Sequence, residues 1–381
     1  MKCRSFSMVI LFVLLSLASV GQYETATSAI EQVMKDQPVA GLSVAVVKNG
    51  RMVYTHSFGL KNIENNIPLT NESIFRIASI SKSFTVTSLM QLVQKRKVSL
   101  DDDVSKLVGF EVRNPKFPGT IITLRMLLSH TSSINDSQGY FSLDSIDPAM
   151  NANWEKCYND YEPGKGYEYC NLNFNMAGTI LEKISGVRFD QYVANHVLKP
   201  LDIYGGYNVN LLDSSRFATI YEYNADSAKF VASPAAYAPR KKEIDNYIMG
   251  YSTPIFSPTG GMKISATGLA RYMLMHMKGG KLDGTRIISK KSERLMRTPL
   301  SEKEHYGLAL LTTKKLIDGE TLIGHTGSAY GLYSAMFFEP KKKFGIVVIT
   351  NGCHPAYTGG YNKVIREVVN KLYGEVVKNN K

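Results

Sequence analysis

A serine and a lysine three residues apart carry the strongest chemical signal in this sequence. Ser79 and Lys82 lie in the stretch Phe75-Arg-Ile-Ala-Ser-Ile-Ser-Lys-Ser-Phe-Thr85, a pattern typical of a helix start. Residues i and i+3 of a helix share one face, so the lysine amine can reach the serine hydroxyl. A serine hydroxyl is a weak nucleophile at neutral pH and needs such a base. The spacing predicts a nucleophile with its base, although an exposed polar helix start has the same pattern.

Two further polar motifs follow at wide separation. Tyr169 and Asn171 come after a Pro-Gly turn, and a spacing of two directs both side chains to one side of an extended loop. Near the C-terminus, an apolar, strand-like region contains the run Gly324-His325-Thr326-Gly327-Ser328. Taken alone, the first motif would more often be a turn and the histidine a structural residue of a strand. These two motifs indicate a catalytic site only in combination with Ser79 and Lys82.

Serine-lysine, Tyr-x-Asn and His-Thr-Gly in this order resemble the penicillin-recognising serine hydrolases, most closely the class C β-lactamases and the related D,D-peptidases and esterases. Residues 122–132, 256–261 and 340–351 also resemble segments of that family, so the similarity covers nearly the whole chain after the first two dozen residues. It implies an α/β fold of the β-lactamase/transpeptidase type. An antiparallel sheet with flanking helices would adjoin an all-helical lobe, with the active site in the cleft between them.

The resemblance also implies roles for the polar residues. Ser79 would form an acyl-enzyme, and Lys82 together with Tyr169 would activate its hydroxyl and pass the proton to the leaving group. Which of these two is the base stays open at the level of sequence. Asn171 would orient the lysine and hold a substrate amide. The backbone N–H groups of Ser79 and Ser328 would form the oxyanion hole, and no metal or organic cofactor is needed.

The His-Thr-Gly strand would bind the substrate through His325, Thr326, Gly327 and Ser328. Class C β-lactamases typically carry lysine where this chain has His325, whereas several D,D-peptidases, aminopeptidases and esterases of the same fold carry histidine. A histidine with an ordinary pKa near 6.5 is mostly neutral at neutral pH. We therefore expect anionic substrates to bind less well as the pH rises through that value, and a β-lactamase to be the less favoured alternative.

Two residues beside the motifs need separate interpretation. His130, in the segment Ile122–Ser132, is expected to be structural and to bond backbone at a helix end. Ser133 stands where the family usually has a glycine in its His-Thr-Ser-Gly stretch. This departure concerns the shape of the local loop and no catalytic role.

The N-terminus has the pattern of a secretory signal peptide. Lys2 and Arg4 precede an apolar run from Met8 to Leu17, and small residues lead to Gly21. Residues 1–21 are therefore predicted to direct export to the periplasm or the cell exterior, with an uncleaved anchor as the alternative. The apolar run is short for a membrane span, and no later stretch could form one.

Export makes cysteine oxidation possible. Cys157 and Cys170 bracket a short loop that ends in the Tyr-x-Asn motif, so they form either a disulfide or two buried thiols. The chain has a net charge of +12, which favours anionic neighbours such as cell-wall polymers or lipid headgroups, although general solubility explains it as well. Nucleic-acid binding has little support, because the lysines are scattered.

The elements that would position these residues come from both ends of the chain. Asn49-Gly50 between two apolar runs predicts a β-hairpin over residues 41–57. Helices are expected at 24–35, from Ser79 to about residue 96, at 173–185 and at 361–377. Strand-like runs occur at 306–312, 321–325, 333–338 and 344–350. The sheet lobe would thus comprise residues 22–78 and 256–381, and the helical lobe residues 79–255, in which 204–247 has no clear pattern.

These observations predict a secreted serine hydrolase that acts on D-amino-acid peptides or small esters and amides, with cell-wall peptides among the candidates. A class C-like β-lactamase is the first alternative. A catalytically silent protein that binds penicillin or cell-wall peptides is the alternative from another class. The acidic run Asp101–Asp103 is interpreted as a helix cap rather than a metal site.

Overall fold

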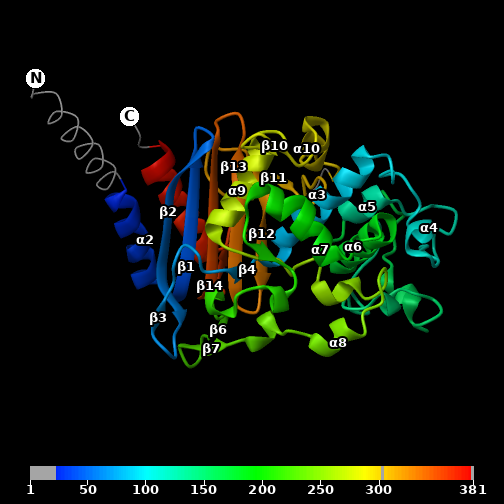
Figure 1. Ribbon diagram of the computed structural model, residues 1–381, viewed down its shortest axis with the longest axis horizontal. Coiled ribbons are helices and arrows are strands. Elements are labelled where there is room, and N and C mark those ends of the chain that lie inside the picture. The colour runs from blue at the N-terminus through cyan, green and yellow to red at the C-terminus, as the bar shows by residue number, and fades with distance from the viewer. Residues whose placement is uncertain (1–22, 302–303, 379–381) are drawn as a thin grey trace, which may run out of the picture.

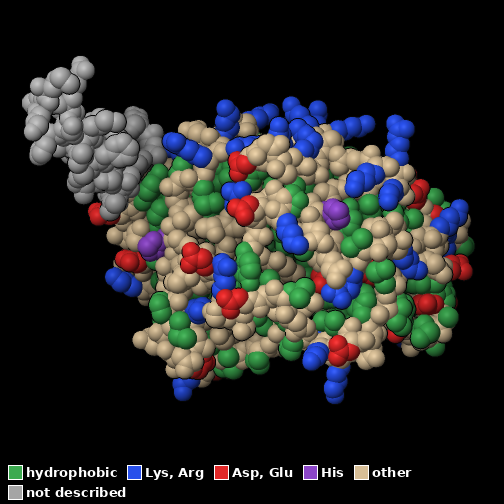
Figure 2. All heavy atoms as spheres, viewed as in Figure 1, with side chains coloured by type: hydrophobic (Ala, Val, Ile, Leu, Met, Phe, Trp, Pro, Cys, Tyr) green, Lys and Arg blue, Asp and Glu red, His purple; other side chains and the backbone are tan. Residues whose placement is uncertain are grey.

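The computed structural model describes residues 23–301 and 304–378 of the 381-residue chain. The expected signal peptide, residues 1–21, lies outside the described residues. Within the described part, no helix has the length and apolar character to cross a membrane. Figure 2 shows lysine and arginine side chains spread over the visible face, mixed with acidic ones, rather than gathered in one patch.

A seven-stranded antiparallel sheet joins the two ends of the chain (Figure 1). Strand β1, from the N-terminal part, pairs directly with β14, from the C-terminal part. The turn between β1 and β2 is Asn49-Gly50, with φ angles of 53° and 75°, as a two-residue hairpin requires. In spatial order the strands are β11 (Leu311–Thr313), β12 (Leu322–Ala329), β13 (Leu332–Glu339), β14 (Phe344–Cys353), β1 (Val39–Lys48), β2 (Arg51–Asn62) and β3 (Ile67–Pro68).

Helices cover both faces of this sheet. The terminal helices α2 (Glu24–Asp36) and α11 (Lys363–Leu372) pack together on one face, and α9 (Ala266–Met277) packs on the other. The buried side of α11 is the apolar stripe Val364, Ile365, Val368, Val369 and Leu372, at helical spacing. The predicted α/β fold with an antiparallel sheet and flanking helices is confirmed.

The chain between the hairpin and α9 has helices joined by long loops, but it is not the all-helical lobe that was expected, because it also contains short strands at residues 205–206, 221–224 and 229–232. Helix α3 (Ser81–Gln94) packs against α6 (Asn171–Ser185), and both are buried along most of their length. Shorter helices complete this region: α4 (Val104–Val108), α5 (Leu124–Leu128), α7 (Phe189–Val193) and α8 (Lys241–Asp245); α10 (Lys290–Met296) follows α9. The segment without a clear sequence pattern contains the hairpin of β6 (Tyr221–Asn224) and β7 (Lys229–Ala232), and then α8.

One predicted strand is largely wrong. Of the run 306–312, only the last residues belong to β11. His305 and Ala309 have positive φ angles of 49° and 59°, and the amide of Gly307 donates to the carbonyl of Leu310. The apolar side chains of this run are buried through turns rather than through a strand, because a buried turn and a buried strand have the same apolar composition.

Candidate active site

Ser79 lies on a tight turn that leads directly into α3. The turn is one 3-10 helix, Ala78–Ile80, between the short strand β4 (Phe75–Arg76) and the helix. Ala78 has a φ of 46°, a conformation that costs energy in an alanine and often marks a functional site. Lys82 is fully buried in the first turn of α3, and its Nζ lies 3.2 Å from Ser79 Oγ. The predicted proximity of the two side chains is present.

The Lys82 amine has three partners from three different elements. Besides Ser79 Oγ, its Nζ donates to Asn171 Oδ1 at 2.9 Å and to the carbonyl oxygen of Thr259 at 3.1 Å. The amide of Asn171 cannot be reversed, because its Nδ2 donates to Asp136 Oδ2. The hydroxyl of Thr259 also donates to Asn171 Oδ1. Asn171 is the first residue of α6, so the helix start fixes the position of the lysine.

Burial shifts the pKa values of Lys82 and Tyr169 in opposite directions. Removal from water lowers the pKa of Lys82 to about 7, against the raising effect of Asp136. Burial raises the pKa of Tyr169, an effect that interaction with the Ser79 side chain opposes only in part. The Tyr169 hydroxyl is buried without a hydrogen bond of ordinary geometry, and Lys82 Nζ lies 4.7 Å from the centre of its ring. At neutral pH the tyrosine is protonated and the lysine is partly neutral.

His130 supports the loop that carries Tyr169. Its Nδ1 accepts a hydrogen bond from the Cys170 amide at 3.1 Å, and its carbonyl accepts one from the Glu168 amide. Its ring lies against that of Tyr169, with 4.3 Å between centres. Burial lowers the pKa of His130 well below its usual value, so the ring is neutral. The predicted structural role, bonding backbone just after α5, is confirmed.

His325 is buried in β12 and has both ring nitrogens engaged. A carbonyl can only accept, so Nδ1 donates to the Thr326 oxygen, and Nε2 therefore accepts from the Tyr306 hydroxyl at 3.0 Å. Burial, together with the nearby Lys82, lowers the pKa of His325 to about 4. The expectation of an ordinary pKa is wrong for this reason. His325 is neutral throughout the range from pH 6 to 8 and gives no titration there.

Strand β12 passes directly beside the turn that carries Ser79. A Cβ atom on Gly327 would lie 2.2 Å from the carbonyl oxygen of Ile77, so only glycine allows the two backbones to approach this closely. The same carbonyl accepts a hydrogen bond from Ser334 Oγ, on the neighbouring strand, at 3.0 Å. The strand thus brings Thr326, Gly327 and Ser328 close to the nucleophile turn, and their roles in substrate and oxyanion binding stay predictions.

Three groups at the site escaped the sequence analysis: Asp136, Thr259 and Tyr306. Asp136 accepts hydrogen bonds from the amides of Asn171 and Leu172 and so caps α6. It is the only one of the three with a carboxylate, and it acts directly on the Lys82 pKa. No local pattern connects it with a motif 35 residues later in the chain. The proximity depends on the tertiary fold.

Cys157 and Cys170 are free thiols, so the possible disulfide between them is a wrong prediction. Cys157 and Cys170 are both buried and unpaired. The thiol of Cys157 contacts the carbonyl of Ser145, whereas that of Cys170 contacts Asp136. Burial raises the pKa of Cys157 to about 11 and that of Cys170 well above its usual value. Within the described residues, no group of three metal-binding side chains of the His, Cys, Asp and Glu types occurs.

A protein-family model described as Beta-lactamase matches residues 26–370. Among curated proteins, the chain is similar to Protein flp of Staphylococcus aureus (strain MRSA252), with 24% identity over 329 residues. That match covers 84% of this chain and 61% of the relative, so the chain spans about three fifths of the relative's length.

Two solved structures have the same fold. The octameric penicillin-binding protein homologue from Pyrococcus abyssi has a TM-score of 0.72 and 27% identity, over 92% of this chain and 77% of the other. The D-amino acid amidase from Ochrobactrum anthropi SV3 has a TM-score of 0.71 and 22% identity, over 93% of this chain and 99% of the other. With its sheet and helices matched over almost the whole described chain, this protein belongs to the Beta-lactamase family of serine hydrolases.

Proposed function

We propose that the protein hydrolyses D-amino-acid peptides or small esters and amides through an acyl-enzyme on Ser79. The observation that carries this proposal is the set of hydrogen bonds around Lys82. Two of the three partners of Nζ, Asn171 Oδ1 and the Thr259 carbonyl, can only accept. A neutral amine has two N–H groups and one lone pair. Neutral Lys82 donates its two N–H groups to these two acceptors, which leaves its lone pair directed at the Ser79 hydroxyl.

This geometry gives each residue a step. Lys82 takes the proton from Ser79 Oγ while that oxygen bonds to the substrate carbonyl carbon. The tetrahedral intermediate then loses its leaving group, which receives the proton held by Lys82 through the Tyr169 hydroxyl, so that Lys82 is neutral again. Water attacks the resulting ester and gives its proton to Lys82, which passes it to Ser79 Oγ as the acid is released. Lys82 is the base that is available at neutral pH, because its pKa of about 7 leaves part of it unprotonated, whereas the raised pKa of Tyr169 keeps that hydroxyl protonated.

Two observations support this substrate class. His325 has no charge at neutral pH, so β12 offers no lysine-like cation to the carboxylate of a β-lactam. The likeness to a D-amino acid amidase and to a penicillin-binding protein homologue agrees with acyl transfer on D-amino-acid amides or peptides. The signal-like N-terminus supports action in the periplasm or outside the cell.

The test is a comparison of substrates under multiple-turnover conditions. D-phenylalanine amide, a D-Ala-D-Ala peptide, p-nitrophenyl acetate and benzylpenicillin are offered to the wild type, to Ser79→Ala and to Ser227→Ala. Ser227 is an exposed serine in the turn between β6 and β7, so its variant is the control for loss of a serine in Ser79→Ala. We expect repeated turnover of an amide, peptide or ester by the wild type and Ser227→Ala only, at a higher kcat/KM than for the penicillin.

Two results would contradict the proposal. A stoichiometric adduct without turnover on any substrate would support a silent penicillin-binding protein. Faster hydrolysis of the penicillin than of every ester, amide and peptide would support a β-lactamase.

A further inference from the structure

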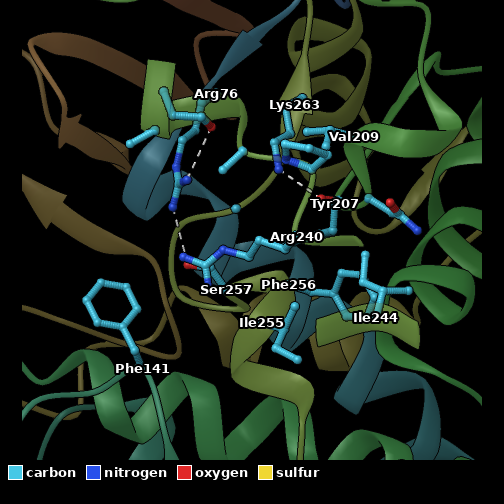
Figure 3. Close-up of a pocket in the computed structure, with 16 residues that line it drawn as sticks. Arg76, Phe141, Tyr207, Val209, Arg240, Ile244, Ile255, Phe256, Ser257 and Lys263 are labelled. Carbon is cyan, nitrogen blue, oxygen red and sulfur yellow. Dashed lines mark hydrogen bonds between the residues drawn. The ribbon is translucent and has the colours of Figure 1, made fainter. Parts of the chain in front are cut away.

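A small cavity lined by three cationic side chains lies beside the loop that holds Lys82. Its volume is about 30 Å³, room for about two water molecules, so it admits a small chemical group rather than a whole ligand. Figure 3 shows the side chains of Arg76, Arg240 and Lys263 extending into the same space from three elements. Phe141 lies at its edge and is 53% exposed, so the cavity borders solvent.

The backbone forces two of these cations together. The small sheet of β4, β8 (Lys263–Ile264) and β5 (Gly205–Gly206) pairs Arg76 directly with Lys263. Like charges opposite each other on neighbouring strands repel. Arg240 approaches from the start of α8, where it has a φ of 47°. Lys263 is 5% exposed, and its burial, together with repulsion from Arg76 and Arg240, lowers its pKa well below the usual value.

No carboxylate compensates for this charge in the described part of the chain. Arg76 donates only to neutral oxygens, those of Gly260, Ala236 and Ser257. Lys263 Nζ donates to the carbonyl of Tyr207 at 2.8 Å. The guanidinium of Arg240 has no hydrogen bond or ion pair with any described residue. Lys263 is buried and the two arginines are partly buried. Cations held close together in such surroundings without a counter-charge are costly, and an anion in the cavity would reduce that cost.

The cavity shares a wall with the catalytic site. Thr259 and Gly260 are consecutive, and their carbonyls accept from Lys82 Nζ at 3.1 Å and from Arg76 Nε at 2.8 Å, respectively. Arg76 also lies only three residues before Ser79. A group bound in the cavity would therefore lie on the opposite side of one loop from the catalytic lysine.

We propose that Arg76, Arg240 and Lys263 form a subsite for a carboxylate or phosphate group of the substrate, an inference that rests on the proposed function. Two guanidinium groups suit the paired oxygens of such an anion, and the Lys263 amine adds a third donor. The subsite would make the enzyme prefer substrates with an anionic group at a distance from the scissile bond. The residues that set this preference are distinct from the neutral His325 in β12. Free phosphate has the same chemistry, so the test must distinguish the two sources.

The first measurement does not depend on catalysis. Thermal unfolding is followed while inorganic phosphate replaces chloride at constant ionic strength, for the wild type, Arg240→Gln, Arg240→Lys and the control Arg51→Gln. Arg51 is exposed at the start of β2. We expect a saturable rise in Tm for the wild type and the control, weakened in Arg240→Gln and partly kept in Arg240→Lys. Equal stabilisation of all four proteins, or of none, overturns the cavity as an anion site.

The second measurement identifies the source of the anion. Two esters that differ only in a terminal carboxylate or carboxamide on the acyl chain are compared on the same proteins. In Arg240→Gln, we expect the preference in kcat/KM for the carboxylate ester over its neutral partner to fall about tenfold, and Arg51→Gln to keep it. An unchanged preference together with phosphate stabilisation means that the cavity binds a free anion, which overturns the substrate assignment. Failure to hydrolyse either ester contradicts the proposed function but leaves the unfolding result intact.

Discussion

Lys82 is the residue on which the chemistry of this site depends. Its amine connects the nucleophile on one side with Asn171 and the Thr259 loop on the other. The spacing of Ser79 and Lys82 predicts their contact, because i,i+3 geometry is local to one helix turn. Asp136, which holds Asn171 and raises the pKa of the lysine, is brought there only by the fold. The motifs thus identify the reacting groups but not the group that tunes them.

The pH dependence of the reaction tests this relation. Burial lowers the pKa of Lys82 to about 7, so the neutral, proton-accepting form increases as the pH rises through 7. We predict that kcat/KM for a neutral ester rises between pH 5.5 and 8.5 with a midpoint near that pKa. The Asp136 anion stabilises the ammonium form, so Asp136→Asn should move the midpoint to lower pH by about one unit.

The control for this profile is Asp226→Asn, at an exposed residue in the β6–β7 turn, which should keep the wild-type midpoint. His325 should add no inflection in this range, because its pKa is about 4. A midpoint that stays in place or moves to higher pH in Asp136→Asn would show that Lys82 is not the base that titrates.

At the scale of elements, one close approach between backbones and one turn with a positive φ shape the region around the site. Strand β12 approaches the Ser79 turn because Gly327 has no Cβ atom. The loop after α5 turns at Ser133, with a φ of 62°, the left-handed region in which glycine is favoured. The serine hydroxyl accepts a hydrogen bond from the buried Asn114 at 3.0 Å. This bond offsets part of the energy that the left-handed conformation costs. The serine that stands in place of the family glycine therefore adopts a backbone conformation that glycine favours.

This balance predicts how two substitutions of Ser133 differ. Ser133→Ala loses the hydrogen bond to Asn114 and keeps the strained φ, whereas Ser133→Gly loses the same bond and relieves the strain. We expect the alanine variant to be less stable than the glycine variant by about 1 kcal/mol, measured by urea unfolding of both proteins. Equal stability, or a more stable alanine variant, would show that the left-handed conformation is not costly at this position.

The sequence predicts those elements whose signals are local. The β1–β2 hairpin and the strands β12 to β14 follow from apolar runs between turn residues. Most of the run 306–312 does not form the expected strand, because its apolar side chains are buried in turns. The segment 204–247 has no periodic pattern, since its short strands and α8 depend on contacts with other parts of the chain. The cationic cavity cannot be predicted from the sequence either, because its three cations come from separate short elements that only the fold brings together.

At the scale of the whole molecule, the two ends of the chain build one sheet, and the helical segment is inserted between them. Pairing of β1 with β14 joins segments far apart in the sequence, as the pairs Val39–Cys353 and Lys48–Phe344 show. Ser79 lies where the chain passes from the first strands into the helices, and His325 lies on the returning strand β12. This topology explains why motifs far apart in sequence meet at one site.

The role of Ser79 as nucleophile is tested most directly by intact-mass analysis of the protein after brief exposure to benzylpenicillin or an activated ester, followed by peptide mapping. We predict one acyl group per chain, attached to the peptide that contains Ser79. It should be absent in Ser79→Ala, whose turnover should fall by a factor of about 10⁴ or more. An adduct on another residue, or undiminished turnover by Ser79→Ala, would contradict the assignment of Ser79 as the nucleophile.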